Sequence, residues 1–580
     1  MTHEFAVWAP TPQRVELIVG DATLEMDRDE HGWWRRTAEE AGPGTRYGLA
    51  LDAGPPRPDP RSPSQPDGVD GRSEVVDHSA FVWGDRAWRG VSPSGAIFYE
   101  LHIGTFTAAG TFDAAIERLP HLVTLGVDAV ELLPVVEFPG EHGWGYDGVD
   151  LFAPHHAYGG ADGLKRLVDA CHSLGMGVVI DVVYNHLGPA GNYLAEFGPY
   201  FSDRHQTNWG PAVNFDGPGS DEVRRFVIDN AIMWLRDYHV DGLRLDAVHA
   251  IVDDSARHIL EQLADEVDAF AAHVQRPLFL IAESDLNDPR FVRGRDAGGY
   301  GLDAAWADEW HHALHAALTG ERAGYYEDFG SLEHLGKALR QAWVYDGTWS
   351  PHRQRHHGRP PAGLAGHQFV VCTQNHDQVG NRARGERSSA LMSDGRLRVA
   401  AALLLAGPFT PMLFQGEEWG SSSPFLFFTD HPDGDLAQAV SEGRRREFAH
   451  FGWAPDDVPD PQDPETFQRS KLDWAETERP PNAGLLAWYR ELIALRRAVP
   501  ALSDPRLDSV DVDVDDDRAC LVVTRGSIKT LVNLGRAPAT FSLYTPRVHL
   551  LAASDPATCA DGDIVHVPAD AVAITDVGRA

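Results

Sequence analysis

The sequence of 580 residues is poor in cysteine, carries few basic residues for its acidic content and has no long hydrophobic run. Its four cysteines include no pair at CxxC spacing, which argues against a disulfide framework and against a zinc site. The longest apolar run covers residues 399–406, far short of the roughly 18 apolar residues of a membrane-spanning helix. The net charge of −36 repels polyphosphate, so neither nucleic acid nor an anionic membrane surface is an expected partner.

The N-terminal residues MTHEFAVWAP lack the basic segment and the apolar run of a secretion signal, so we expect a cytoplasmic protein. We take a monomer as its expected state. The hydrophobic content of 43% is ample for a large core and, at this length, predicts about two to four domains.

Three segments of the chain differ in pattern. Short strand-like runs separated by turn residues, FAVWAP, RVELIVG and GWWRRTA, predict an N-terminal β-sandwich over residues 1–90. From residue 503 to 580, apolar and polar residues alternate again, which predicts a C-terminal β-sandwich. In residues 508–517 aspartates alternate with valines. We interpret this run as an edge strand whose charges discourage pairing with other strands, with a cation site as the alternative.

Residues 91–502 alternate between apolar runs and segments of helical periodicity. Continuous apolar runs are typical of parallel strands buried on both faces, and eight such runs occur here. Eight such strands alternating with helices predict an α/β fold, the (β/α)8 TIM barrel, with a short insert at 187–220 after the third strand. The eight runs are IFYELHIG, AVELLPV, GVVIDVVYNH, GLRLDAV, PLFLIAES, LDAAWADEW, QFVVCTQNH and TPMLFQGEE.

Conspicuous polar residues lie at the ends of these runs, where a (β/α)8 barrel carries its catalytic groups. Asp246 follows the fourth run, Glu283 the fifth and Asp377 the seventh. Ionisable groups are costly to desolvate, so three of them at the mouths of apolar strands indicate a functional site. The alternative is that these acids are structural ion pairs and helix caps in an inert barrel. That interpretation is weakened by further polar residues at the strand ends: Asp181, His186, Arg244 and His376.

The three acids suit the cleavage of a glycosidic bond. A retaining glycosidase needs two carboxyl groups about 5–5.5 Å apart, and neighbouring strands can supply them from Asp246 and Glu283. Arg244 lies two residues before Asp246 on the same strand face and would keep Asp246 ionised. The apolar residues before Glu283 would raise its pKa, so that it can donate a proton. Asp377 would then stabilise the developing positive charge.

Four segments, DVVYNH, GLRLDAVH, IAES and QNHDQVGN, resemble the signature segments of the α-amylase family of glycoside hydrolases. This resemblance implies that Asp246 is the nucleophile, Glu283 the general acid/base and Asp377 the transition-state stabiliser. The first ninety residues are similar to the sandwich module that precedes the barrel in branching and debranching enzymes. The resemblance also implies which residues surround the attacked glucose: Tyr146, Asp181, His186, Arg244 and His376.

Several loop stretches, among them IAESDLNDPRF and PMLFQGEEWGSSSPFLFFTDH, are similar to those of family members that act on maltooligosyltrehalose. This resemblance implies hydrolysis of the α-1,4 bond next to a terminal trehalose, with release of trehalose and a maltooligosaccharide. The candidates for binding the trehalose part are Trp310 in the 308–311 cluster and Phe425 and Asp430 in the 425–430 loop.

No metal and no cofactor are expected. Many α-amylases hold calcium partly through a histidine in a pattern like DAAKH, and Ala250 stands at that position here. Calcium needs about six to eight oxygen ligands. Because the insert after the third strand is short, we do not expect it to supply them.

Two other functions stay open at this stage. A 1,4-α-glucan branching enzyme or a debranching enzyme would share the barrel and the covalent mechanism, but branching enzymes usually carry Pro where Tyr184 stands. A non-catalytic glycan-binding protein on a decayed barrel is the other, although all three acids are present. The basic stretch 343–367 is equally compatible with a flexible lid and an inert surface loop.

Overall fold

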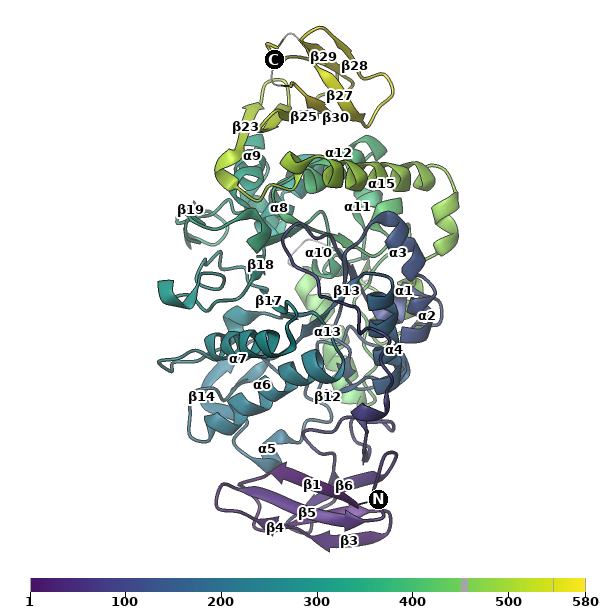
Figure 1. Ribbon diagram of the computed structural model, residues 1–580, viewed down its shortest axis with the longest axis vertical. Coiled ribbons are helices and arrows are strands. Elements are labelled where there is room, and N and C mark those ends of the chain that lie inside the picture. Colours follow the sequence, from purple (N-terminus) through teal and green to yellow (C-terminus); the bar gives the residue numbers. More distant parts are fainter. Residues whose placement is uncertain (1, 450–456, 546, 579–580) are drawn as a thin grey trace.

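The computed structural model describes residues 2–449, 457–545 and 547–578. A central barrel lies between a group of β-sheets near the N-terminus and a second group near the C-terminus, at opposite ends of the molecule (Figure 1). The predicted fold class, a TIM barrel flanked by two strand-rich parts, is confirmed. Within the described residues, no helix is both long and apolar enough to span a membrane.

The N-terminal strands form two sheets, one in the order β1-β5-β4 and one in the order β3-β2-β6-β7 with β8 beside β6. Apolar residues alternate along β1 and β2, so that Phe5, Val7, Val15 and Leu17 are buried between the sheets. The strands are β1 (Thr2–Trp8), β2 (Val15–Val19), β3 (Ala22–Glu25), β4 (Asp27–Arg28), β5 (Trp33–Glu39), β6 (Arg46–Leu51), β7 (Pro56–Arg57) and β8 (Ser73–Glu74).

Each of the eight predicted runs forms one strand of a closed parallel barrel. Its interior is filled by side chains that meet across the strands. Phe98 on the first strand and Phe279 on the fifth, for example, stack with ring centroids 6.0 Å apart. The strands are β9 (Phe98–Leu101), β10 (Ala129–Leu132), β13 (Gly177–Val182), β16 (Gly242–Leu245), β17 (Phe279–Ala282), β18 (Ala304–Trp306), β21 (Phe369–Cys372) and β22 (Thr410–Phe414).

Helices cover most of the barrel, as their apolar stripes predict. The helix predicted to close the barrel near 485–495 is present as the last helix before the C-terminal sheets. The fifth strand departs from the expected repeat, because only the short η4 (Arg295–Ala297) lies between it and the sixth strand. That stretch is rich in Asp and Gly, without helical periodicity. The main helices are α3 (Leu119–Leu125), α4 (Gly160–Ser173), α6 (Ser220–Asp237), α7 (Ile259–Val274), α8 (Asp308–Thr319), α9 (Leu332–Gln341), α12 (Asp394–Leu405) and α15 (Asn482–Ala498).

Three small two-stranded sheets extend from the barrel. The predicted insert after the third strand contains one of them, a hairpin. Another lies in the stretch 343–367, where Trp343, Val344 and Tyr345 are buried and anchor the start of the segment. The strands are β11 (Val136–Glu137), β12 (Asp150–Pro154), β14 (Phe201–Thr207), β15 (Gly210–Val213), β19 (Trp349–Ser350) and β20 (Arg355–His356).

The C-terminal strands form a sheet in the order β23-β24-β25-β30-β27 and a smaller sheet in the order β26-β29-β28. The acidic run lies in β23, which is an edge strand as predicted. We propose domain boundaries near residues 90 and 502, which fall between these sheets and the barrel. The strands are β23 (Val510–Asp515), β24 (Cys520–Arg525), β25 (Ile528–Asn533), β26 (Ala539–Ser542), β27 (His549–Ala553), β28 (Cys559–Asp561), β29 (Ile564–Val567) and β30 (Ala571–Asp576).

Two buried arginines tie the C-terminal sheets to the barrel. Arg496 on α15 and Arg525 on β24 both donate from Nη1 to the carbonyl oxygen of Leu502, at 2.7 Å each. Arg525 also donates to the carbonyl of Ala406, at 3.0 Å. Because these carbonyls follow helices and have no helical partners there, the guanidinium groups satisfy them and hold the two parts together.

Candidate active site

Arg244 on β16 is the centre of the site. Its Nη1 donates to Oδ2 of Asp181 at 2.7 Å and to Oδ1 of Asp246 at 2.8 Å. Its Nη2 lies 3.7 Å from Oε2 of Glu283. The guanidinium packs 4.2 Å from the ring centroid of Trp306. The ends of the third, fourth and fifth strands therefore come together around one buried cation.

Asp246 is held in a fixed orientation by donors on both carboxylate oxygens. Besides the bond from Arg244, Nδ2 of Asn185 donates to Oδ2 of Asp246 at 2.8 Å. Ala247, the next residue, has a positive φ of 39°, a conformation that non-glycine residues rarely adopt. This turn directs the N–H of Ala247 to Oε2 of Glu283, at 2.6 Å. The strained turn thus links the two carboxyl groups.

Glu283 has the properties of a proton donor. Burial raises the pKa of Glu283 well above its usual range. The positive charge of Arg244 opposes that rise, and the nearby negative charges, that of Asp246 first, add to it. A carboxyl group with a raised pKa remains protonated closer to neutral pH, which a general acid requires.

Tyr146, Asp181 and His376 form a second cluster beside the acids. The Tyr146 hydroxyl donates to Oδ2 of Asp181 at 2.6 Å, and its oxygen lies 2.8 Å from Nε2 of His376. Burial raises the pKa of Asp181 to about 6, although Arg244 opposes the change. Burial alone would lower the pKa of His376, but the charges of Asp377 and Glu100 raise it to about 9.

Asp377 lies at the open side of this cluster. Its side chain is 42% exposed, and its Oδ1 is 3.5 Å from Nε2 of His376. Nδ2 of Asn381 donates to the same oxygen at 3.4 Å. An accessible carboxylate with only long contacts within the protein has room to accept hydrogen bonds from a bound sugar.

A cavity of about 360 Å³ adjoins Tyr146 and His186. Nε2 of His186 lies 2.9 Å from the carbonyl oxygen of Tyr146, and the imidazole stacks on Trp209 with centroids 4.8 Å apart. Aromatic walls with a polar base suit a pyranose ring, whose faces are apolar and whose edges carry hydroxyls. The wall includes Trp144, Trp209, Phe427, Thr429 and His431.

Two predicted substrate contacts are wrong. Trp310 and Phe425 are both fully buried and packed among apolar side chains, so neither can touch a ligand in this structure. Trp310 is in the first turn of α8 on the side that faces the hydrophobic core. Phe425 stacks on Trp144 at 5.2 Å and thereby supports the cavity wall from behind. In the same loop it is Phe427, two residues later, that lines the cavity.

Asp430 joins two loops near this wall. Its Oδ2 accepts a hydrogen bond from the N–H of Glu141 at 2.8 Å, and it lies 3.6 Å from Nδ1 of His142. Its side chain is partly exposed, between the cavity residues Thr429 and His431. A role for Asp430 in substrate binding stays a prediction.

Sequence reasoning did not assign Trp209 or Glu100 to the site. Trp209 is a large exposed ring in the β14–β15 hairpin, and an exposed tryptophan in an insert was a usable signal. Glu100 is a single acid within the apolar run IFYELHIG, and a buried charge needs a partner. Its partner, His376, is 276 residues away, so only the fold reveals the pair.

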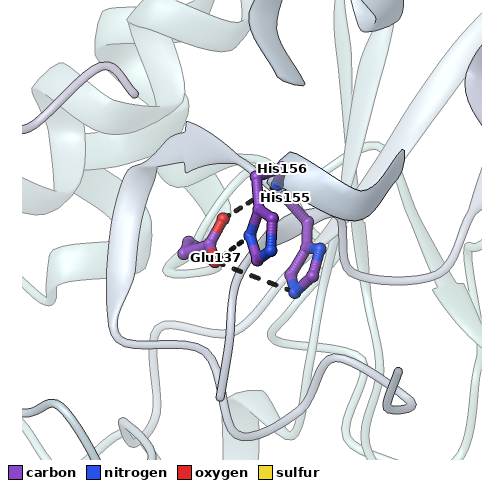
Figure 2. A group of neighbouring side chains, drawn as sticks. All are labelled: Glu137, His155 and His156. Carbon is purple, nitrogen blue, oxygen red and sulfur yellow. Dashed lines mark hydrogen bonds and ion pairs between the residues drawn. The ribbon is translucent and has the colours of Figure 1, made fainter. Parts of the chain in front are cut away.

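Among the described residues, two groups place three possible metal-ligand atoms within 4.8 Å of one another. One consists of Glu137, His155 and His156 (Figure 2). There, Glu137 accepts from Nδ1 and from the backbone N–H of His156, at 2.7 and 2.9 Å. Nδ1 of His155 accepts from the N–H of Ala157, so the hydrogen of this buried, neutral ring is on Nε2, where a metal would need the lone pair.

The other group consists of His205, Asp216 and Asp254. Oδ2 of Asp216 lies 3.0 Å from Nε2 of His205 and accepts from the N–H of Asp254 at 3.1 Å. In each group one histidine already contacts a carboxylate directly, His156 with Glu137 at 2.7 Å and His205 with Asp216 at 3.0 Å. The absence of a metal cofactor stays a prediction.

Comparisons with known proteins identify the family of the chain. Residues 69–209 match the alpha amylase catalytic domain family. The chain is 55% identical to Malto-oligosyltrehalose trehalohydrolase from Arthrobacter ramosus, over 93% of this chain and 94% of the relative. It is 50% identical to the enzyme of the same name from Rhizobium sp. strain M-11, over 97% and 96% respectively.

A solved structure gives the same result at the level of the fold. It is from Salmonella typhimurium, is described provisionally as an alpha amylase, and matches with a TM-score of 0.91 at 39% identity, covering 99% of this chain and 98% of that one. Both relatives are at least 50% identical to the chain over more than 90% of each protein. The chain therefore belongs to the malto-oligosyltrehalose trehalohydrolases, within the α-amylase family of glycoside hydrolases.

Proposed function

We propose that this protein hydrolyses the α-1,4-glucosidic bond next to the terminal trehalose of maltooligosyltrehalose by a retaining double displacement, releasing trehalose and a maltooligosaccharide. The observation that supports it most is the arrangement at Arg244, which contacts both Asp246 and Glu283 from one buried position. Two carboxyl groups in different environments, one held by strong donors and one with a raised pKa, are what a nucleophile and an acid need.

In the first step Asp246 attacks the anomeric carbon of the glucose that precedes the trehalose. Glu283 gives its proton to the leaving glycosidic oxygen, so that trehalose departs as a neutral molecule. The bonds from Arg244 and Asn185 keep the Asp246 carboxylate in one orientation, which lowers the cost of reaching the attack geometry. The product of this step is a covalent glycosyl ester on Asp246.

In the second step water replaces Asp246. Glu283, now ionised, removes a proton from the water while the water oxygen attacks the anomeric carbon, and Asp246 leaves as a carboxylate. Both steps pass through a positively charged, oxocarbenium-like transition state, beside which we place Asp377. Tyr146, His186 and His376 surround the position that this glucose would occupy.

Branching is the nearest alternative, because it uses the same covalent intermediate with a sugar hydroxyl as acceptor. Product analysis distinguishes the two. Purified protein with maltotriosyltrehalose should release free trehalose and maltotriose in equal amounts, and with amylose it should form no α-1,6 branches. Branched glucan without trehalose release would contradict the proposal. A cytoplasmic location and a monomeric state stay predictions.

A further inference from the structure

We propose that Glu100 is a positioning residue that keeps the active-site imidazole of His376 protonated on both nitrogens. Glu100 is on β9, at the base of the site, is buried, and has both carboxylate oxygens engaged by His376. Its effect would pass through His376, which faces Tyr146 and Asp377. This inference rests on the proposed function only where it assigns the imidazolium a role in catalysis. The protonation state of His376 itself does not depend on that function.

One carboxylate binds two groups of the same histidine. Nδ1 of His376 lies 2.6 Å from Oε1 of Glu100, and the backbone N–H of His376 donates to Oε2 at 3.0 Å. Because both oxygens are engaged, the carboxylate fixes the side chain and the backbone of His376 together. An ionised Glu100 is an acceptor, so Nδ1 must carry a hydrogen.

Counting protons on Tyr146 shows the state of the other nitrogen. The Tyr146 hydroxyl has one hydrogen, and it is donated to Oδ2 of Asp181 at 2.6 Å. The oxygen of Tyr146 is therefore the acceptor in its 2.8 Å contact with Nε2 of His376. Nε2 must then carry a hydrogen as well. A ring with hydrogens on both nitrogens is an imidazolium, which agrees with the pKa of about 9.

A second buried acid lies beside Glu100 but has different partners. Glu131 on β10 is in register with Glu100 on β9, and each is 1% exposed. Two adjacent carboxylates repel each other in a medium of low dielectric constant. Burial, followed by the charge of Glu100, raises the pKa of Glu131 well above its usual range. Glu100 accepts two hydrogen bonds from His376, whereas Oε2 of Glu131 has no hydrogen-bond partner among the described residues.

Other titratable groups also face His376. Asp377 favours the imidazolium, whereas Arg244 and burial oppose it, so the outcome depends on the acids at the ring. Asp377 contacts the ring at 3.5 Å, compared with 2.6 Å for Glu100. Glu100 is therefore the shorter and fully buried contact. The remaining titratable groups around the ring are Tyr146, Asp181, Glu131 and His102.

The test is to compare Glu100→Gln with a matched control. Glutamine has the same size, but its amide can donate to Nδ1, which leaves the ring neutral with one hydrogen. Glu137→Gln is the control, because Glu137 binds His156 in the same way outside the catalytic cluster. In ¹⁵N-histidine NMR at pH 7.5, assigned with a His376→Gln sample, wild type should show two protonated nitrogens on His376. Glu100→Gln should show one, and Glu137→Gln should show two.

Kinetics provide the second readout. We expect Glu100→Gln to lower kcat/KM for maltotriosyltrehalose by about 10- to 100-fold, the effect that loss of the partner of a metal-ligating histidine has in metalloenzymes. Glu137→Gln should change it by less than about twofold, and Glu100→Asp, which keeps the charge, should keep His376 doubly protonated and recover part of the activity.

A neutral His376 in wild type, or an imidazolium that persists in Glu100→Gln, would overturn the inference. The wild-type spectrum tests it even if the variant does not fold. The protonation state does not depend on which substrate is cleaved. A failure of the proposed function would therefore show only in the products, and a failure of this inference would show in the spectrum.

Discussion

Two histidine–glutamate pairs in this protein have nearly the same geometry and different surroundings. In each, one carboxylate accepts from Nδ1 and from the backbone N–H of the histidine, at 2.6 and 3.0 Å for His376 with Glu100 and at 2.7 and 2.9 Å for His156 with Glu137. Each histidine has a pKa raised to about 9. The local chemistry is therefore the same in both places.

The difference lies at the other nitrogen. Nε2 of His376 faces Tyr146 and Asp377 in the site, whereas Nε2 of His156 lies 3.3 Å from the exposed Glu141. One pair can thus present its charge to a substrate, and the other joins β11 to the short η2 (His156–Tyr158) that follows β12 (Figure 2). A carboxylate that binds Nδ1 and the backbone N–H accompanies a raised histidine pKa in both places. The position of the pair in the barrel decides whether the histidine can act on a substrate.

The largest loss of activity is expected from a substitution of the nucleophile, in the same site as the His376–Glu100 pair. Asp246→Asn keeps the shape of the side chain but cannot form the glycosyl ester, so kcat should fall by about 10⁴-fold or more. The measurement is turnover of maltotriosyltrehalose, with circular dichroism to show that the barrel is intact. Asp511→Asn, on the edge strand β23, is a matched control with expected wild-type activity. Retained activity in Asp246→Asn would remove Asp246 from the mechanism.

Glu283→Gln tests the acid, and its expected loss is about 10²- to 10⁴-fold in kcat. The raised pKa of Glu283 keeps the acid protonated to higher pH than an ordinary carboxyl group. Wild-type kcat/KM should therefore decline as pH rises through that pKa, because the ionised form cannot donate. The pH profile of the variant should lack this decline. If kcat/KM of Glu283→Gln still declines at high pH as in the wild type, the decline is due to another group.

A smaller effect is expected at the cavity wall. Trp209→Ala removes the ring that stacks on His186, and we expect KM to rise by about fivefold, or ~1 kcal/mol, with little change in kcat. Trp349→Ala is the control, because Trp349 is similarly exposed, at 51% compared with 49%, in another hairpin. Equal effects of the two substitutions on KM would argue against a sugar contact at Trp209.

The smallest effect is expected from a substitution in the His156–Glu137 pair, and we expect it to change stability only. His156 has a folded pKa of about 9, above the usual 6.5, because of its bond with Glu137. The stabilisation is complete below about pH 6.5 and is lost as pH rises through about 9. His156→Gln should therefore lower Tm by about 1–2 °C at pH 6 and by less at pH 10, with unchanged kcat. A difference that grows with pH would contradict this sign.

The barrel was predictable from the sequence because its signal is local. Each strand is a continuous apolar run, and the acids at their ends stand out against it, so Asp246, Glu283 and Asp377 could be placed before the fold was known. Residues two apart on a strand share a face, which is why the contact of Arg244 with Asp246 could be expected from the sequence.

The orientation of single side chains could not be predicted in the same way. Whether Phe425 or Phe427 lines the cavity depends on the path of an irregular loop, and whether Trp310 faces the core depends on where α8 begins. The pairing of Glu100 with His376 joins the first strand to the seventh and has no local pattern at all. Such long-range contacts come from closure of the barrel, which composition and periodicity do not encode.

The most direct test of the account is the order in which products form from maltotriosyltrehalose, followed by ¹H NMR from the first seconds of the reaction. Retaining hydrolysis at the bond next to trehalose predicts free trehalose together with maltotriose that first appears as the α-anomer and then mutarotates. Maltotriose that first appears as the β-anomer would contradict the roles assigned to Asp246 and Glu283, and cleavage that leaves glucose attached to trehalose would contradict the proposed position of the cleaved bond.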